Sequence, residues 1–286
     1  MKSAVEFELK SPQERARIQP GVPLLDLQIS ADYPHNMGVL RDLQLTMQAG
    51  EIVGLVGESG SGKSTLALAI LRLLDLKGGS TSGSVRLNGR ELMSLSDAEM
   101  RAVRGRDIGL VLQSPMSSLN PALKIVTQMH ETWRAHRTGD RKQSVPEFLN
   151  LLRGLNLDVD EKFLNRKPAQ LSVGQAQRVL IAMAMIHRPP LLIADECTSA
   201  LDLITQKEVL NIFRGLSREM GTGILLISHD LLAVASLCDR IAILRAGEIV
   251  EQGATREVLA QPAHPYTREL VAALPLGSVP FAVANG

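Results

Sequence analysis

The chain has 286 residues, which is enough for one large domain or two modest ones with a sizeable core. Its 31 basic and 30 acidic residues give a net charge of +1, which excludes a strong overall attraction to nucleic acid or to an anionic membrane. Aromatic residues make up only 3 % of the chain, too few for a platform on which nucleic-acid bases stack.

We expect no targeting or membrane-spanning segment. No apolar stretch follows Lys2, as a signal peptide requires, and no uncharged apolar run reaches the roughly 18 residues of a transmembrane helix. Cys197 and Cys238 stand alone, without the spacing of metal ligands. These features predict a cytosolic chain in a reducing compartment.

Two strands are expected after an irregular, charge-mixed extension over residues 1–22. Leu24–Ile29 and Val39–Met47 both alternate apolar and polar residues. Tyr33 lies in the loop expected between them, where an aromatic residue usually only packs. Its ring could instead lie flat against an adenine base, and we favour that role.

A phosphate-binding loop follows the apolar run Ile52–Val56, which predicts a buried strand. Gly57 begins the pattern G-x-x-x-x-G-K-[ST], and a helix is predicted from Gly62 to near Leu74. The glycines let backbone N–H groups surround an anion, and the helix adds the positive end of its dipole. Lys63 supplies a charge for the β- and γ-phosphates, and the Ser64 hydroxyl can coordinate Mg²⁺. A glycine- and serine-rich loop that contains a lysine by chance is the weaker alternative.

Two further strands are expected before the middle of the chain. Ser84–Gly89 predicts a strand that closes on an Asn-Gly turn. Ile108–Leu112 predicts a buried strand with Gln113 at its end, where the side-chain carbonyl can serve as a neutral ligand for Mg²⁺ or for the attacking water.

A separate helical lobe is expected over residues 122–170. Helices are predicted over Ile125–Arg137 and over Pro146–Leu155, the second with its proline in the first turn. His130 and His136 are interpreted as ordinary helix residues, because their spacing does not place them on one face as metal ligands.

The next helix and strand both carry polar residues at their ends. Ser172 occupies the N-cap position of a predicted helix that runs through Val179–Ile186, so this helix start either binds an anion or is merely capped. Leu191–Ala194 predicts a buried strand that ends in Asp195 and Glu196. Adjacent residues of a strand point in opposite directions, so Asp195 is expected to hold Mg²⁺ and Glu196 to polarise a water that attacks the γ-phosphate.

The last elements surround a single histidine. Ser199–Asp202 starts another helix, and Ile224–Ser228 predicts the last buried strand, which ends at His229. At the sheet edge where the phosphate loop also lies, this histidine is placed to contact a γ-phosphate. Ile241–Leu244 and Glu248–Glu251 then predict a hairpin.

Taken in order, these motifs resemble the ATP-binding subunits of ABC transporters over about residues 24–275. GESGSGKST at 57–65 matches the Walker A loop, and LLIADE at 191–196 matches the Walker B strand with its catalytic glutamate. LSVGQ at 171–175 matches the signature, and SALD at 199–202 matches the D-loop. The positions of the Q-loop glutamine, the switch histidine and the A-loop aromatic are taken by Gln113, His229 and Tyr33.

The resemblance implies an α/β fold, a P-loop ATPase cassette with a mainly parallel core sheet, an antiparallel β subdomain and an inserted helical subdomain at about residues 115–175. The cassette is expected over residues 23–255 and a C-terminal tail over 256–286. QSPMSSLNP after Gln113 and HPYTRELVAALP in the tail resemble the oligopeptide/dipeptide/nickel importer subfamily in particular.

The resemblance also assigns the site. Catalytic roles fall to Glu196, His229 and Gln113, and Mg²⁺ is expected on Ser64, Gln113 and Asp195. ATP is expected to contact Tyr33, Gly57, Glu58, Ser59, Gly60, Ser61, Gly62, Lys63, Ser64 and Thr65, with Ser172, Gly174, Gln175 and Asp202 completing the composite sites of a dimer.

The implied assembly is a head-to-tail dimer with a paralogous ATPase, two transmembrane permease subunits and an extracytoplasmic solute-binding protein, with no nucleic acid. The chain would sit peripherally on the cytoplasmic face of the inner membrane. ATP hydrolysis would power import of a small peptide or a similar solute, with nickel or a metal chelate as a variant.

The chain departs from the family pattern at two positions. Val173 replaces the first glycine of the usual LSGGQ, so its side chain either points away from the phosphate or crowds the dimer interface. Cys197 replaces the usual proline, and the loop after Glu196 is expected to be less rigid. The tail has no cysteine, so no iron–sulfur centre is expected.

Other functions are less favoured. The nearest alternative is the ATPase of an exporter, and the HPYT tail is the only sequence feature against it. A soluble ABC protein acting on nucleic acid or ribosomes usually has tandem cassettes or a long coiled coil, neither of which is expected here. A GTPase would require an Asn-Lys-x-Asp motif, which the sequence lacks.

Overall fold

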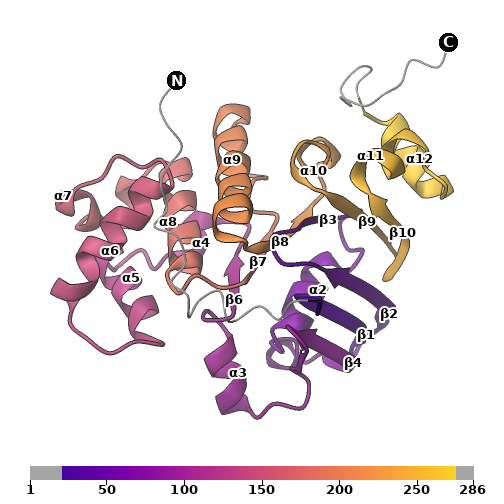
Figure 1. Ribbon diagram of the computed structural model, residues 1–286, viewed down its shortest axis with the longest axis horizontal. Coiled ribbons are helices and arrows are strands. Elements are labelled where there is room, and N and C mark those ends of the chain that lie inside the picture. The colour runs from indigo at the N-terminus through magenta and orange to yellow at the C-terminus, as the bar shows by residue number, and fades with distance from the viewer. Residues whose placement is uncertain (1–20, 275–286) are drawn as a thin grey trace.

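The computed structural model describes residues 21–274, and the N-terminal extension expected over residues 1–22 lies almost wholly outside that range. Figure 1 shows a central sheet, an antiparallel sheet and a lobe of helices at the far side of the central sheet. This arrangement confirms the predicted fold class. The domain boundaries that we placed at residues 23 and 255 stay a prediction.

The central sheet has six strands in the order β10-β9-β3-β8-β7-β6. All neighbours pair in parallel except the edge strand β10, which is antiparallel to β9. In chain order the strands are β3 (Ile52–Val56), β6 (Ile108–Val111), β7 (Leu191–Asp195), β8 (Gly223–Ser228), β9 (Arg240–Arg245) and β10 (Glu248–Ala254).

The prediction that β8 is the last buried strand is wrong. The predicted hairpin forms, but its first strand, β9, also pairs in parallel with β3 inside the central sheet. Its four middle residues, Ile241–Leu244, are consequently all buried rather than alternately exposed.

The second sheet is antiparallel, with the order β2-β1-β4-β5. Its strands are β1 (Leu25–Tyr33), β2 (Asn36–Met47), β4 (Ser80–Leu87) and β5 (Arg90–Glu91). Tyr33 is therefore the last residue of β1, opposite Asn36 of β2, and not a loop residue as predicted. The strands are longer than expected because the connection between them is only a short turn.

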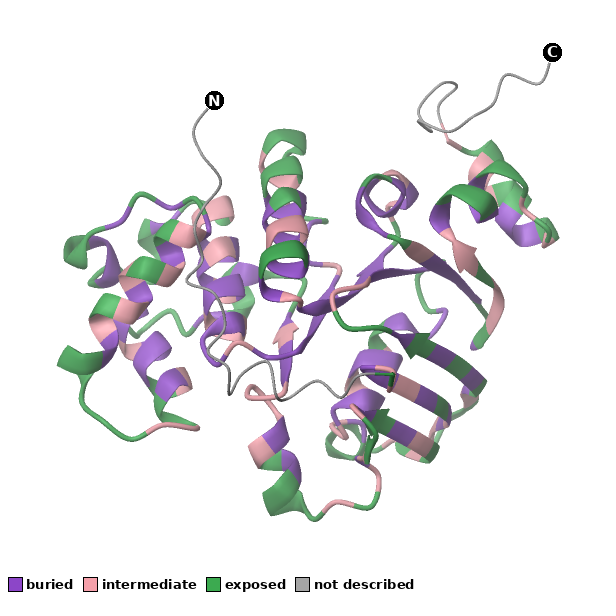
Figure 2. Ribbon diagram, viewed as in Figure 1, coloured by how far each residue is buried: buried purple, intermediate pink, exposed green. Residues whose placement is uncertain are grey.

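One helix joins the two sheets into a shared hydrophobic core. Helix α2 (Lys63–Ile70) places Leu66 and Ile70 in the same buried cluster as residues from β1, β3 and β8. It ends at Ile70, and the expected end near Leu74 is wrong, since Arg72 adopts a positive φ of 49° that a helix cannot continue through. Figure 2 shows the central strands buried and the outer face of α9 exposed.

Further helices lie outside the helical lobe. They are η1 (Asp75–Lys77), α3 (Asp97–Val103), α9 (Leu203–Met220), α10 (Leu231–Leu237), α11 (Thr255–Ala260) and α12 (Pro265–Ala272). Within the described range, no helix is both long and apolar enough to cross a membrane.

The helical lobe contains more helices than predicted. It comprises α4 (Pro115–Ser118), α5 (Ile125–Arg134), α6 (Arg141–Gly154), α7 (Glu161–Leu164), η2 (Pro168–Gln170) and α8 (Val173–Met185). Helix α5 ends at Arg134, so His136 lies beyond the helix in which we expected it, and its Nε2 is 2.8 Å from the backbone oxygen of Arg104.

The start of α6 was predicted five residues too late. Asp140 and Gln143 form a capping box, in which each side chain accepts a hydrogen bond from the other's backbone N–H. This cap starts the helix at Arg141, so Pro146 lies inside it and not in its first turn. The helix tolerates the proline at the cost of one hydrogen bond to the carbonyl of Lys142.

Candidate active site

The phosphate loop connects the buried end of β3 to the start of α2. Gly62 is the N-cap of α2 with a φ of 107°, and a Cβ there would lie 2.7 Å from Leu40 and 2.9 Å from the carbonyl oxygen of Val39. A Cβ on Gly57 would lie 2.2 Å from the carbonyl oxygen of Leu244. These two glycines are therefore required by the close approach of β2 and β9, and they fix the loop as a cradle of backbone groups.

Lys63 lies inside this cradle, with only 4 % of its side chain exposed. Its ammonium group donates to the carbonyl oxygens of Gly57 and Glu58, both at 2.8 Å, and lies 3.8 Å from Glu196. Burial lowers the pKa of Lys63, although Glu196 and Asp195 oppose that shift. A phosphate bound next to this ammonium group would stabilise its positive charge, which burial separates from water.

Asp195 ends β7 next to the first turn of α2. The Ser64 hydroxyl donates to its carboxylate at 3.2 Å, which brings together the two oxygen ligands predicted for Mg²⁺. Burial raises the pKa of Asp195, and the neighbouring charge of Glu196 raises it further. A divalent cation suits this pair, because it would compensate a buried carboxylate that is costly to ionise alone.

Glu196 is the residue on which the predicted catalytic groups meet. Its carboxylate accepts a hydrogen bond from Gln113 Nε2 at 3.1 Å and lies 3.4 Å from His229 Nδ1. Gln113 follows β6 and His229 follows β8, so the ends of strands on both sides of β7 deliver these contacts. The structure thus brings together Lys63, Ser64, Gln113, Asp195, Glu196 and His229.

The backbone turns sharply at Glu196. Its φ of 47° is unusual for a residue with a side chain, and its N–H donates to the Ile227 carbonyl at 2.9 Å. Such strain is typical of functional positions, where the surrounding structure holds it in place. Cys197, which follows, is buried, and burial raises the pKa of its thiol to about 12. It therefore fills space as an inert thiol in the position of the usual proline.

The signature residues lie at the start of α8. Ser172 is the N-cap, and its hydroxyl accepts from the Gln175 N–H at 3.2 Å while the Gln175 side chain accepts from the Ser172 N–H. Gly174 packs so tightly on α9 that a Cβ would lie 2.7 Å from Thr205. Val173 is 42 % exposed, so much of its side chain is open to solvent in the single chain.

Asp202 caps the start of α9 and is exposed. Its carboxylate accepts from the N–H groups of Ile204 and Thr205, both at 3.0 Å, and these bonds, led by that of Thr205, lower its pKa. Among the described residues, no hydrogen bond or ion pair joins Asp202 or the signature to the phosphate loop. The nine predicted residues 57–65 of the phosphate loop are thus separate from Ser172, Gly174, Gln175 and Asp202. Tyr33 is half-buried against the hydrophobic core that α2 shares with the two sheets.

Two contacts of this site were not predicted from the sequence. Ser199 accepts a second hydrogen bond from Gln113, at 3.3 Å, although we noted it only as part of the D-loop motif. Tyr266, from the tail motif HPYT, accepts a hydrogen bond from the backbone N–H of Glu58 in the phosphate loop. A separation of 208 residues gives the sequence no local signal for that contact.

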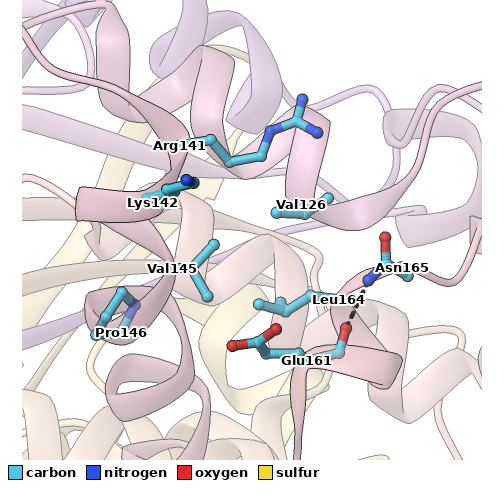
Figure 3. Close-up of a pocket in the computed structure, with 8 residues that line it drawn as sticks. All are labelled: Val126, Arg141, Lys142, Val145, Pro146, Glu161, Leu164 and Asn165. Atoms are coloured by element: carbon cyan, nitrogen blue, oxygen red, sulfur yellow. Dashed lines mark hydrogen bonds between the residues drawn. The ribbon is translucent and has the colours of Figure 1, made fainter.

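A pocket of about 450 Å³ lies elsewhere, between α5, α6 and α7 of the helical lobe (Figure 3). It includes none of the predicted site residues, and its lining mixes charged and apolar side chains from Val126, Arg141, Lys142, Val145, Pro146, Glu161, Leu164 and Asn165.

Comparison with known proteins agrees with this geometry. A model of the ABC transporter family matches residues 40–199. The oligopeptide transport ATP-binding protein OppD of Escherichia coli K12 is 38 % identical over 251 residues, which cover 87 % of this chain and 74 % of OppD. The glutathione import ATP-binding protein GsiA of the same strain is 41 % identical over 245 residues, which cover 84 % of this chain.

The chain spans only 39 % of the length of GsiA. Among solved structures, the dimeric ATP-binding cassette MJ0796 bound to ADP and Pi superposes with a TM-score of 0.67 at 28 % identity, over 81 % of this chain and 98 % of that one. The family model, the relatives and the fold agree with one another, and the chain belongs to the ABC transporter family, whose ATP-binding cassette it forms.

Proposed function

We propose that this chain hydrolyses ATP and thereby powers the import of a small peptide or a similar solute through membrane-spanning partner subunits. The observation that carries the proposal is the position of Glu196. One carboxylate lies within reach of Lys63, Gln113 and His229, beside the pair formed by Ser64 and Asp195. A solvated acidic turn would not gather these groups from four different elements.

In this proposal the phosphate loop binds the triphosphate. Backbone N–H groups of residues 57–65 surround the phosphates, and Lys63 neutralises their charge in a buried position. The half-buried ring of Tyr33 would pack against the base. Ser64, Asp195 and Gln113 would hold Mg²⁺, which when bound neutralises charge on the phosphate oxygens.

Glu196 would act as the general base for the attacking water. Gln113 donates to its carboxylate through the side-chain N–H, which leaves the side-chain carbonyl free to orient a water or to face Mg²⁺. His229, 57 % exposed, lies near the same carboxylate oxygen as Gln113 and is open to a γ-phosphate. The three residues would therefore act as one unit, with Glu196 at its centre.

The second half of each site would come from a partner cassette. Ser172 and Gln175 bond to each other and Asp202 caps α9, and within residues 21–274 none of these side chains has a hydrogen bond to the phosphate loop of the same chain. Leu203 and Ile204, next to Asp202, are 83 % and 75 % exposed, as apolar residues at an interface would be in a lone chain. We propose a head-to-tail dimer with a paralogous ATPase, an arrangement in line with the dimeric state named for the similar structure.

Contact with a permease would use a mainly apolar groove of about 330 Å³ between the central sheet and the helical lobe. The groove includes Leu112, which immediately precedes Gln113 and is 43 % exposed. A segment of a membrane-spanning subunit seated there would contact the residue next to the catalytic unit. The chain would then lie peripherally on the cytoplasmic face of the membrane, with an extracytoplasmic binding protein on the other side.

The solute class rests on the relatives, whose names specify oligopeptide transport and glutathione import. Both solutes are peptides, so a small peptide is favoured over nickel or a metal chelate. The ATPase of an exporter is the second candidate, since the same site would serve either direction.

The test is affinity purification of the full chain from detergent-solubilised membranes, followed by mass spectrometry and an ATPase assay of the complex. We expect two multi-span proteins, a second ATPase and Mg²⁺-dependent hydrolysis. Recovery of ribosomal or DNA-repair proteins without a membrane component would contradict the transport proposal. A pure chain that binds no nucleotide would contradict the ATPase proposal itself.

A further inference from the structure

The C-terminal helix α12 reaches the phosphate loop through one buried side chain. Tyr266, in its first turn, is 2 % exposed, and its hydroxyl accepts a hydrogen bond from the backbone N–H of Glu58 at 3.1 Å. Glu58 is the second residue of the Walker A loop. A residue 208 positions away therefore contacts the loop expected to hold the phosphates of ATP.

The peptide unit that Tyr266 contacts also carries a bond to Lys63. Its N–H belongs to Glu58, and its carbonyl belongs to Gly57, which accepts from the Lys63 ammonium at 2.8 Å. In a trans peptide the two groups point in opposite directions, so Tyr266 and Lys63 hold the unit from opposite sides. Rotation of this peptide plane would break both bonds, and each bond polarises the amide in the sense that strengthens the other.

The tyrosine is itself held in place. Arg245, at the end of β9, lies 4.7 Å above the centre of its ring. Helix α12 begins at a cap in which His264 accepts from the Tyr266 N–H at 3.2 Å. The carboxylate of Glu251 in β10 accepts from the N–H groups of Ala263 and His264, at 2.8 and 3.0 Å.

The hydroxyl is suited to this contact at any physiological pH. Burial raises the pKa of Tyr266, and the charge of Glu58 adds to the rise. The group therefore stays neutral, and the Glu58 N–H keeps the same partner.

Figure 1 shows α11 and α12 beside β9 and β10, at the end of the sheet opposite the helical lobe.

We propose that Tyr266 is a positioning residue for nucleotide binding, through which the C-terminal helix sets the orientation of the Gly57–Glu58 peptide and hence of Lys63. The inference rests on the nucleotide site of the proposed function and adds to it a long-range support from the tail. Because coupling is reciprocal, bound nucleotide must in turn stabilise α12 against local opening.

The test compares Tyr266→Phe with Thr267→Val in the full chain. Both variants remove one hydroxyl from neighbouring buried residues of α12, but only Tyr266 contacts the loop. Affinity for Mg²⁺–ADP is measured by titration calorimetry, and amide hydrogen exchange is measured with and without Mg²⁺–ADP.

Loss of one net hydrogen bond predicts that Tyr266→Phe weakens nucleotide affinity by about two- to tenfold, whereas Thr267→Val leaves it unchanged. The Glu58 amide should exchange faster in Tyr266→Phe. Nucleotide should slow exchange over residues 265–272 in the wild-type chain and in Thr267→Val, but not in Tyr266→Phe.

Equal affinities of the wild-type chain and Tyr266→Phe would overturn this inference and leave the proposed function intact. Equal losses in both variants would also overturn it, because the tail would then act only through general stability. A wild-type chain that fails to bind Mg²⁺–ADP would overturn both the proposed function and the inference.

Discussion

Two aspartates seven positions apart illustrate how differently the two halves of the site are built. Asp195, beside the phosphate loop, is buried, and burial raises its pKa, whereas Asp202 is exposed and its pKa is lowered by the backbone N–H groups it caps. The phosphate-loop side holds charges that a ligand would stabilise. On the signature side, Ser172 and Asp202 already accept hydrogen bonds from the helices that they cap. A partner subunit would therefore bind there through the exposed surface.

The largest expected effect tests whether the catalytic group lies on the phosphate-loop side. Glu196→Gln removes a base but keeps the shape and the acceptor for Gln113. We expect kcat to fall by about 10²- to 10⁴-fold, as removal of a general base does, with ATP affinity changed by less than about threefold. Steady-state ATPase assays and nucleotide titration measure the two quantities. Full turnover by this variant would exclude Glu196 as the base.

A second prediction concerns the rigidity of the phosphate loop. Gly62→Ala places a side chain at a φ of 107° and within 3 Å of Leu40 and Val39, so we expect a loss of about 1–3 kcal/mol in unfolding free energy and strongly weakened nucleotide binding. Gly215→Ala is the matched control, because it lies inside α9 with only Glu219 nearby, and it should stabilise the chain by up to about 1 kcal/mol. The unfolding free energies of both variants are measured by chemical denaturation. Equal values for Gly62→Ala and Gly215→Ala would contradict the close packing described around Gly62.

The third prediction concerns the pKa values of Asp195 and Asp202, which are shifted in opposite directions. Because the pKa of Asp195 is higher in the folded chain than in the unfolded chain, its ionised form destabilises the fold. This destabilisation grows as the pH rises from the unfolded-state pKa and is complete above the folded-state pKa. Asp195→Asn should therefore raise the melting temperature of the nucleotide-free chain at pH 7, with a smaller gain near pH 4. Scanning calorimetry over that range measures this difference.

Asp202→Asn is the control for that measurement. The lowered pKa of Asp202 contributes stability above its unfolded pKa that is lost as pH falls through the folded value, so this variant should not gain stability at pH 7. A rise in melting temperature with both variants would show that removal of net negative charge, not burial of Asp195, is responsible.

The smallest effect is expected at Val173, on the signature side. Its side chain is 42 % exposed at the first position of α8, so Val173→Gly should change ATPase activity of the assembled complex by less than about threefold. A large gain in activity would indicate that the valine crowds the dimer interface.

Most of the phosphate-loop side could be predicted from the sequence because its signals are local. The strand before Gly57 and the carboxylates at the end of β7 each depend on neighbouring residues alone, as does the N-cap at Ser172 on the signature side. The errors arose where a distant partner or a stronger local signal decided the outcome. The capping box at Asp140 starts α6 before Pro146, although proline favours the first turn of a helix. Strand β9 was predicted only as part of a hairpin, but its pairing with β3 buries it in the central sheet.

The contact of Tyr266 with the phosphate loop shows the same limit for function. The motif HPYT indicated a subfamily, but only the folded chain places its hydroxyl on the Glu58 N–H. Likewise, the grouping of Gln113 and His229 on one carboxylate depends on strand order, which brings the ends of β6 and β8 to either side of β7.

The missing side chain of Gly174 affects how the cassette can move. Because a Cβ there would lie 2.7 Å from the methyl group of Thr205, any other residue at this position would require Thr205 or the start of α8 to shift. Asp202 in turn bonds the Thr205 hydroxyl at 2.7 Å. Thr205 thus lies between the signature helix and the aspartate of the D-loop motif, and we expect a rotation of the helical lobe to change the position of Asp202 as well. In that case Gly174 would act as a spacer between two helices in addition to any contact with phosphate.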